Sequence, residues 1–402
     1  MRRIGLVPLL PVLLVCGANQ ARGDGAFPNA MQVLARAGDA QELHLGATFG
    51  LVATEDFGAD WSYVCEPYIT GGTNVILYAQ ERDGTLLALA DKLWRSSDAG
   101  CTWTQIAPAS GTAGWSDVFI DPTVSQRAYA ISFTADSGPR ALWESSDGAQ
   151  SFPTLLDTGV DGLVSVESAA SNPEVIYATN AVYAGSATPL LARSGDGGAT
   201  WVSFPIAAPV PSIVRILAVS PDDPNTLWLR ASNVDTSADD IWFTSDGGQT
   251  LAIIYSSPVP LTGFARSSDG TVYAADGAAG LLVNAPASSG FIRVGTPHFL
   301  CLGALGARLF GCGDSLKDPF NLAFSDDRGQ SWNPLLSFPQ ITGPAACVQS
   351  ACASDWVYQQ TQFAALEPKP GSGCGSFPLG GEGAALLALL LLRRSRSHRM
   401  VG

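Results

Sequence analysis

The chain is poor in basic residues and in charge of any kind. Its 402 residues include 22 Lys and Arg against 36 Asp and Glu, and only 14% of its residues are charged. Residues 24–373 hold 15 of the basic and 35 of the acidic side chains, a formal charge of −20. Nucleic acids and anionic lipid surfaces are themselves negative, so this balance opposes binding to either. We expect no nucleic-acid partner.

Histidine is also scarce, because only His44 and His298 lie outside the C-terminal 29 residues. A Ser-His-Asp triad would need one of them, and neither lies in a recognisable nucleophile motif. A zinc site would need closer Cys and His clustering. The acidic loops 235–240 and 314–318 could offer oxygen ligands to calcium, but they lack the spacing of a known calcium loop. We expect no metal and no cofactor.

Long apolar runs occur only at the two ends of the chain. Arg2 and Arg3, an apolar run over residues 4–15 and small residues up to position 23 predict a secretory signal peptide over residues 1–23. Cys16 suggests lipidation as an alternative, but Val15 before it is larger than the small residue such a site needs. Export of the chain is therefore expected.

The C-terminal end combines Cys374, a Gly-rich stretch, an apolar run over residues 384–392 and a cluster of arginines. Nine apolar residues are too few for a firm transmembrane helix, although counting from Phe377 extends the run to 16. The order of these parts closely resembles the MYXO-CTERM sorting tag of myxobacterial surface proteins, from which Glu382 and the short run depart. The resemblance implies a tag over residues 374–402, processing near Cys374, transient membrane contact through the tag, and display on the cell surface or outer membrane, or secretion.

One octapeptide pattern recurs along the chain, and its clearest copy is SGDGGATW at residues 194–201. Apolar segments precede and follow this copy, which is typical of the turn of a β-hairpin. In such a turn the Asp carboxylate can accept backbone N–H groups, the glycines permit positive φ, and the final aromatic residue packs on its own sheet. The anchoring residues are Asp56, Asp98, Asp147, Asp196, Asp246 and Asp327, and the aromatic residues are Trp61, Trp103, Phe152, Trp201 and Trp332.

The anchors lie 42, 49, 49, 50 and 81 residues apart. The last interval is double, and its midpoint falls on residues 284–291, where Pro286 replaces the Asp and only Phe291 keeps the pattern. This regular spacing predicts a single repeat domain of seven units. The pattern resembles the Asp-box, or bacterial neuraminidase, repeat found in β-propellers. The resemblance implies an all-β fold over residues 24–345, a seven-bladed β-propeller of four-stranded antiparallel blades, and it says little about function.

Each unit has the same order: a first strand, a tight turn, a second strand, a variable loop, a third strand entering the Asp pattern and a fourth strand leaving it. Antiparallel order places the first-to-second turns and the Asp patterns at one rim and the second-to-third loops at the other. Binding usually resides in loops that vary on a constant scaffold, so we expect a ligand at the second rim and at the tunnel mouth it surrounds. Its variable loops are residues 134–140, 180–188, 231–240 and 313–320.

Six cysteines remain when Cys16 and Cys374 are set aside, and an even number in an exported chain favours disulfides. Sequence proximity suggests three pairs, one of fifteen possible connectivities, with partly free thiols as the alternative. A two-residue turn at Gly306-Ala307 would place Cys301 directly opposite Cys312. The suggested pairs are Cys65 with Cys101, Cys301 with Cys312, and Cys347 with Cys352.

No catalytic motif accompanies the repeats. Sialidases need three arginines around a carboxylate, but the Arg-Ile-Pro motif of that family is absent and Arg36 lies in the sequence LARA. Other glycosidases need two carboxylates facing each other across the tunnel, which the sequence alone does not select. Five further arginines at strand ends are the candidates for a set that converges on a substrate carboxylate: Arg215, Arg230, Arg266, Arg293 and Arg308.

We therefore favour a non-catalytic, monomeric, surface-displayed or secreted propeller that binds a protein or a glycan. The alternative is a secreted glycoside hydrolase. Residues 346–373 are expected to form a closing segment and a linker, with residues 347–363 irregular and partly aromatic.

Overall fold

The computed structural model describes residues 28–366, except for residues 37, 73–76, 109–110, 136–139, 186, 287 and 289. The described residues all lie within one compact unit. The predicted signal peptide over residues 1–23 and the predicted tag over residues 374–402, with Cys374, therefore lie outside the described residues.

The strands pair antiparallel in successive groups of four. The first three groups are β1 (Ala30–Ala35), β2 (Leu43–Ala47), β3 (Gly50–Thr54) and β4 (Ser62–Cys65); β5 (Leu77–Gln80), β6 (Leu86–Leu89), β7 (Leu93–Ser96) and β8 (Thr104–Ile106); and β9 (Gly114–Ile120), β10 (Ala128–Phe133), β11 (Arg140–Ser145) and β12 (Thr154–Leu156). The next two are β13 (Leu163–Ala169), β14 (Asn172–Val182), β15 (Leu190–Ser194) and β16 (Val202–Pro205); and β17 (Ser212–Val219), β18 (Leu227–Asn233), β19 (Asp239–Thr244) and β20 (Ala252–Ser257).

The last two groups share one long strand. They are β21 (Gly263–Arg266), β22 (Val272–Ala275) and β23 (Ala279–Asn284) with the first half of β24 (Ile292–Leu305); and the second half of β24 with β25 (Arg308–Gly313), β26 (Leu322–Ser325) and β27 (Asn333–Leu336). The predicted four-stranded antiparallel sheets are thus confirmed. Residues 285–291, the position of the degenerate repeat, connect β23 to β24.

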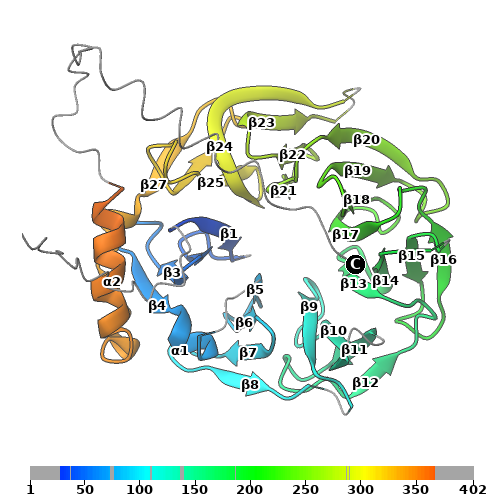
Figure 1. The fold of residues 1–402 in the computed structure, drawn as a ribbon, viewed down its shortest axis with the longest axis horizontal. Helices are drawn as coiled ribbons and strands as arrows, with labels where there is room; N and C mark the ends of the chain where they lie inside the picture. The colour runs from blue at the N-terminus through cyan, green and yellow to red at the C-terminus, as the bar shows by residue number, and fades with distance from the viewer. Residues whose placement is uncertain are drawn as a thin grey trace, which may run out of the picture. The chain divides into compact units, whose positions relative to one another are not determined.

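The first strands of the groups contact one another in sequence: β1 with β5, then β9, β13, β17, β21 and β24, which contacts β1 again. Within the unit formed by residues 28–366, the sheets therefore succeed one another around a central axis (Figure 1).

Burial within a group follows the position of the strand. Second strands such as β6, with sequence LLAL, and β22, with sequence VYAA, are buried at every residue because neighbouring groups cover both of their faces. They accordingly read as continuous apolar runs rather than as alternating ones. Fourth strands such as β8, with sequence TQI, and β12, with sequence TLL, are mostly exposed. The core is thus a series of apolar layers between adjacent sheets.

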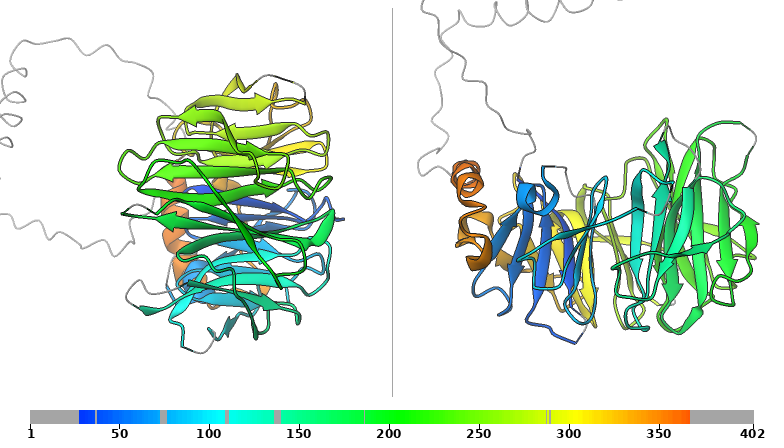
Figure 2. Two further views of the ribbon diagram at one scale, coloured as in Figure 1. Left: turned by 90° about the vertical axis from the view of Figure 1, so that its right-hand side faces the viewer. Right: turned by 90° about the horizontal axis from the view of Figure 1, so that it is seen from below.

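The C-terminal segment returns to the first group. After β27 the chain forms η2 (Phe338–Gln340), β28 (Gly343–Pro344), η3 (Ala346–Val348) and α2 (Ala353–Ala364). β28 pairs parallel with β4, and α2 contacts β28 and η2. Figure 2 shows α2, in orange, beside the blue strands of the first group. Rings of Phe49, Phe338 and Phe363 pack together with centroids 5.0 to 5.5 Å apart. The expectation that residues 347–363 are irregular is therefore wrong, and α1 (Glu66–Thr70) was also not predicted.

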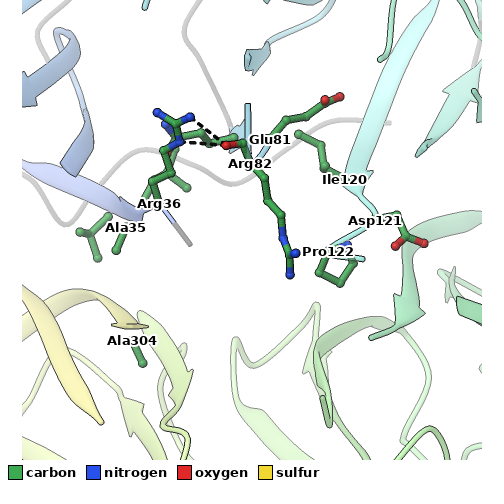
Figure 3. Close-up of a pocket in the computed structure, with 11 residues that line it drawn as sticks. Ala35, Arg36, Glu81, Arg82, Ile120, Asp121, Pro122 and Ala304 are labelled. Carbon is green, nitrogen blue, oxygen red and sulfur yellow. Dashed lines mark hydrogen bonds between the residues drawn. The ribbon is translucent and has the colours of Figure 1, made fainter. Parts of the chain in front are cut away.

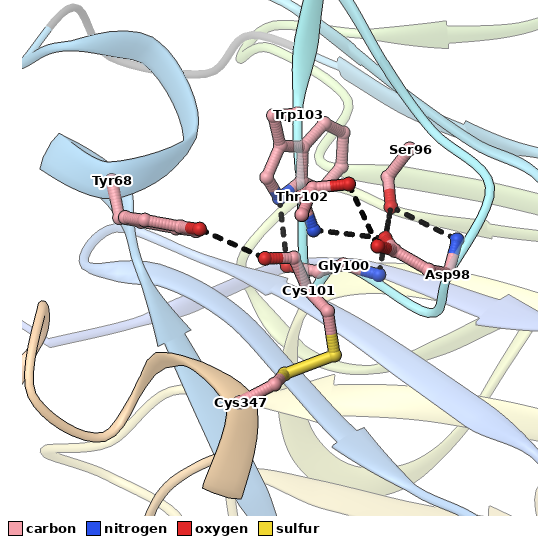
Figure 4. The surroundings of a disulfide bond; sticks show 8 residues. All are labelled: Tyr68, Ser96, Asp98, Gly100, Cys101, Thr102, Trp103 and Cys347. Carbon is pink, nitrogen blue, oxygen red and sulfur yellow. Dashed lines mark hydrogen bonds between the residues drawn. A yellow bond between two sulfur atoms is a disulfide. The ribbon is translucent and has the colours of Figure 1, made fainter.

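Three disulfides are present, and they correct two of the three suggested pairs. Cys301 pairs with Cys312, and their strands are joined at Gly306-Ala307, as predicted. Cys65 instead pairs with Cys352, and Cys101 with Cys347 (Figure 4). The physical reason is that the C-terminal segment crosses the first two groups. It brings Cys352 to Cys65, 287 residues earlier in the chain, and Cys347 to Cys101, 246 residues earlier. Disulfides of this kind indicate an oxidising, exported environment.

Candidate functional site

The six turns between third and fourth strands that contain the pattern, here called the Asp turns, share one hydrogen-bond network. In the turn at residues 194–201, Ser194 Oγ accepts from Gly198 N at 2.8 Å and donates to Asp196 Oδ1 at 2.8 Å. Asp196 also accepts from Thr200 N at 2.9 Å and from Thr200 Oγ1 at 2.6 Å. Gly197 and Gly198 have φ of 71° and 90°, so the turn requires two successive residues in the left-handed region.

The same carboxylate position is occupied in all six Asp turns, and the hydrogen bonds lower its pKa. The hydroxyl hydrogen bond, followed by the backbone hydrogen bond from the same residue, holds the pKa of Asp196, Asp246 and Asp327 at about 2. The pKa values of Asp56, Asp98 and Asp147 are also lowered. These carboxylates accept hydrogen bonds within their own turns, which connect the third and fourth strands.

The Asp turns lie at one rim with the first-to-second turns of the same groups. Gly148 N donates to Gln126 O, Gly197 N to Glu174 O and Gly247 N to Asn225 O, each at 2.9 Å. We call this the turn rim. The opposite rim, here the loop rim, holds the second-to-third loops, whose lengths differ: residues 48–49 join β2 to β3, whereas residues 183–189 join β14 to β15.

Several exposed apolar side chains lie on the loop rim, and others, such as Leu155 and Ile292, lie on outer strands. Tyr183 is 58% exposed and Val234 is 44% exposed. They flank Pro211, because Val182, next to Tyr183, pairs with Ser212, and Val234 N donates to Pro211 O at 3.1 Å. Leu316, on another loop of this rim, is 71% exposed. Loops of this rim are held by their own side chains, as where Asn233 Oδ1 accepts from Thr236 N at 2.9 Å.

A second feature is a cavity of about 370 Å³ in the central tunnel, among β5, β9, β13 and β17. Its walls are mainly apolar, with Asp117 on β9, Glu167 on β13 and Arg215 on β17 as the charged members. Asp117 Oδ2 accepts from Val166 N at 3.0 Å, and Glu167 Oε2 accepts from Val219 N at 3.1 Å. Each of these carboxylates therefore lies on the first strand of one group and accepts a hydrogen bond from the first strand of the following group.

Both tunnel carboxylates titrate far from their ordinary range. Burial raises the pKa of Asp117 to about 7, although Arg215 opposes this shift. Burial, and to a lesser extent the charge of Asp117, raises the pKa of Glu167 to about 8. An apolar cavity with a few convergent polar groups and shifted pKa values is a candidate binding or catalytic site.

Sequence reasoning missed Asp117 and Glu167. The available signal was a single carboxylate on an otherwise uncharged first strand, in WSDVFI at residues 115–120 and VSVES at 164–168. Because first strands line the tunnel, such a position faces neither a layer between sheets nor open solvent.

A cavity of about 330 Å³ lies where β1, β5 and β9 end at the turn rim (Figure 3). Arg36 Nε and Nη2 donate to Arg82 O at 3.0 and 2.8 Å. Asp121, at another edge of the cavity, binds Arg127 at 2.8 Å. Arg36 and Asp121 are thus held by hydrogen bonds, whereas Glu81 is buried and its Oε1 has no hydrogen-bond partner in the described structure.

The five arginines that are candidates for a converging set do not converge. Arg266 binds Asp222 at 2.7 Å, Arg293 binds Asp276 at 2.5 Å and Arg308 binds Asp326 at 2.7 Å. Arg230 lies 3.9 Å from Asp239. Of the five, only Arg215 lines the tunnel cavity described above, where the carboxylate clamp of a sialidase would need three.

Among the remaining sequence candidates, the acidic loop residues have hydrogen-bond partners, whereas Nδ1 of His298 and Nδ1 of His44 have none in the described structure. His298 Nδ1 lies 3.5 Å from Asp318, whose Oδ2 accepts from Asp314 N at 3.1 Å. Asp240 accepts from Ser256 at 2.5 Å. His44 is buried, and burial lowers its pKa. The described residues contain no group of three His, Cys, Asp or Glu side chains placed to hold a metal ion. Among them, too, no helix combines the length and apolarity needed to cross a membrane.

Comparisons with known proteins identify the fold. No protein-family model and no curated protein matches the chain. The structure of YCF48 from Cyanidioschyzon merolae aligns at 15% identity and a TM-score of 0.50 over 72% of this chain and 94% of that one. The Dos1 propeller aligns at 9% identity and a TM-score of 0.52 over 77% of this chain and 80% of that one. An ancestral GH74 enzyme aligns at 17% identity and a TM-score of 0.49 over 65% of this chain, which spans 38% of that one.

At these identities the likeness concerns the fold alone. Together with the antiparallel four-strand groups around a central axis, it defines the chain as an all-β protein with a β-propeller fold. Propellers serve many unrelated functions, so function must be argued from this chain's own sites.

Proposed function

We propose that this protein is an exported, surface-displayed β-propeller of seven blades, built from Asp-box repeats, that binds a protein or glycan partner without catalysis. The seven four-strand groups would be its blades, and residues 1–23 and 374–402 would direct export and sorting. The three disulfides support the exported compartment. A monomeric ring leaves both rims free for a partner.

The apolar patch on the loop rim, formed by Tyr183, Pro211 and Val234, carries the proposal of binding. Exposed apolar side chains that adjoin one another on a soluble surface mark interaction sites more often than isolated ones do. Tyrosine combines a large apolar ring with a hydroxyl, which suits both protein contacts and stacking on a sugar ring. The partner surface should be neutral or basic, because the chain is strongly acidic.

The test compares matched surface variants of the full mature protein. Partners found by a glycan array, or by crosslinking on the surface of the producing cells, are purified and their affinities measured by calorimetry. Tyr183→Ser combined with Val234→Ser should weaken binding by about ten-fold or more, the loss typical of truncating central interface residues. Ile253→Ser removes a 48%-exposed apolar side chain from the outer strand β20 and should leave affinity unchanged. Equal losses in both variants would refute the placement on the loop rim.

A second candidate function, a glycoside hydrolase, is favoured by one observation, the pair of tunnel carboxylates with raised pKa values. Glycoside hydrolysis uses one protonated carboxylic acid and one carboxylate, and a raised pKa is what the acid requires. A panel of fluorogenic glycosides tests this candidate. Hydrolysis that disappears in both Asp117→Asn and Glu167→Gln would replace the non-catalytic proposal. Hydrolysis unaffected by either change would indicate a contaminating enzyme.

The proposed sorting is tested by mass spectrometry of protein released from the cell surface. The mature chain should end near Cys374 and lack the apolar run. Recovery of peptides beyond Arg394 in that material would contradict processing at the tag.

A further inference from the structure

The first Asp turn, at residues 54–61, departs from the other five at its hydroxyl position and from the three others that end in Trp at its indole. The hydroxyl position of the pattern holds Asp60, where the other turns hold Thr or Ser. In those turns the hydroxyl donates to the central carboxylate, as Thr102 does to Asp98 at 2.7 Å and Thr250 to Asp246 at 2.6 Å. Asp60 supplies only its backbone N–H, to Asp56 Oδ1 at 3.0 Å. The substitution removes a stabilising donor and adds a second carboxylate.

The second departure concerns the indole N–H of Trp61. The corresponding indoles of Trp103, Trp201 and Trp332 donate to a backbone carbonyl of their own turn at 3.0 to 3.2 Å. Trp61 is only 2% exposed, and its Nε1 has no hydrogen-bond partner in the structure. A buried donor without a partner is costly, so buried polar groups usually have a bound partner.

Asp60 and Trp61 both line the same cavity. A cleft of about 760 Å³ at the turn rim is lined by the first Asp turn, by Asp83 and Ala99 of the second group, and by residues 344–347 of the C-terminal segment. Cys101 and Cys347 both line it, and Figure 4 shows the disulfide between them. Thr342 N and Oγ1 donate to Trp61 O at 2.9 and 2.8 Å, which fixes the segment against the turn.

The cleft is acidic and contains a second unpartnered group. Five carboxylates line it against one arginine, and that arginine is bound to a lining glutamate at 2.5 Å. His44, with 3% of its side chain exposed, has no partner at Nδ1, which lies 3.7 Å from the nearest glutamate oxygen. Burial lowers the pKa of His44, so its imidazole is neutral and can accept a hydrogen bond. The charged lining residues are Glu42, Glu55, Asp56, Asp60, Asp83 and Arg36.

We propose that this cleft binds a lysine side chain of a peptide. A protonated amine has three donors and no acceptor, which suits the carboxylates of Asp60 and Asp83 and the free Nδ1 of His44. The indole N–H of Trp61 needs an acceptor, which the backbone carbonyl of a peptide supplies and a simple amine does not. The site lies on the turn rim, so it is separate from the loop-rim patch and does not depend on it.

The test titrates the full mature protein with three probes, using the indole resonance of Trp61 in NMR spectra and calorimetry. The probes are an N-acetylated, C-amidated lysine tripeptide, the same peptide with its side-chain amine acetylated, and spermidine. The lysine peptide should shift the Trp61 resonance saturably, more strongly than spermidine, and the acetylated peptide should have no effect. Equal binding of the acetylated peptide, no saturable shift at millimolar peptide, or equal or tighter binding of spermidine would each overturn the proposal. The same shift produced by calcium alone would assign the cleft to a metal instead.

Two variants locate the site without endangering the fold. Asp60→Thr restores the residue present in three other Asp turns and should weaken the lysine peptide by about ten-fold through loss of one charge-assisted hydrogen bond. Trp61→Phe follows the third turn, where Phe152 holds this position, and should weaken the peptide without affecting spermidine. The matched control, Thr200→Asp, adds the same carboxylate to a turn that does not line this cleft and should leave binding unchanged. Unchanged affinity in Asp60→Thr, or a loss in Thr200→Asp as large as in Asp60→Thr, would refute the assignment.

Discussion

Removal of the Cys101–Cys347 disulfide tests how strongly the C-terminal segment is anchored by its link to the second strand group. Cross-links stabilise mainly by restricting the unfolded chain, more so for longer loops. Alone, a link over 246 residues is worth about 5 kcal/mol of unfolding free energy. The Cys65–Cys352 disulfide already closes the larger loop that contains this one, however, so Cys101–Cys347 shortens the closed chain path to about 41 residues and is worth about 4 kcal/mol.

The expected signature is therefore non-additive. Cys101→Ser with Cys347→Ser should lower the unfolding free energy by about 4 kcal/mol, and adding Cys65→Ala with Cys352→Ala should lower it by about 5 more. Cys301→Ala with Cys312→Ala, across 11 residues, should cost about 3 kcal/mol. Urea denaturation at pH 7 without reductant, followed by tryptophan fluorescence, measures all three. The reasoning is refuted if the first removal costs less than about 1 kcal/mol, or if the second removal costs less than the first.

Four further predictions concern the turns and the tunnel. Asp147→Ala should lower the unfolding free energy by about 1 to 2 kcal/mol in urea, because backbone and hydroxyl donors lose their acceptor; no change would contradict this role. Ala99→Gly should raise the unfolding free energy by about 0.5 to 1 kcal/mol, because Ala99 has φ of 56°, in the left-handed region that favours glycine. Gly248→Ala should lower the unfolding free energy, because the new Cβ would lie 2.7 Å from a leucine methyl. The folded pKa of Asp196, about 2, lies below its unfolded value, so its stabilisation is present above about pH 4 and lost as the pH falls toward 2; an acid titration of Asp196→Asn should lack this loss. The folded pKa of Asp117, about 7, lies above its unfolded value, so Asp117→Asn should gain stability over the wild type between pH 4 and 8, and an equal difference at both ends would contradict it.

Local features of the fold were predictable because they depend on residues close in sequence. The Cys301–Cys312 register follows from a two-residue turn, and the second strand Ala128–Phe133 was bounded by turn residues on either side. The network around Asp196 likewise needs only the eight residues of its own turn.

The closure of the ring was not predictable from such signals. Cys352 meets Cys65 and β28 meets β4 only because the chain completes a circuit, so no short-range pattern records the contact. The helix α2 has weak amphipathic patterning, with Gln359 and Phe363 as its buried residues, and it is stabilised by the rings it packs on. Sequence proximity was therefore a poor guide to two of the three disulfides.

The repeat itself provides the control by which functional residues can be recognised. A residue that appears at the same position in every turn, such as the Asp that accepts the backbone N–H groups, is explained by what every turn needs. Asp60 and Trp61 occupy repeat positions but lack the hydrogen bonds that their counterparts make, and both line one acidic cleft. Asp117 and Glu167 interrupt apolar first strands and carry the cost of burial. Because a stabilising residue was available at each position elsewhere in the same chain, these departures are better explained by binding than by folding.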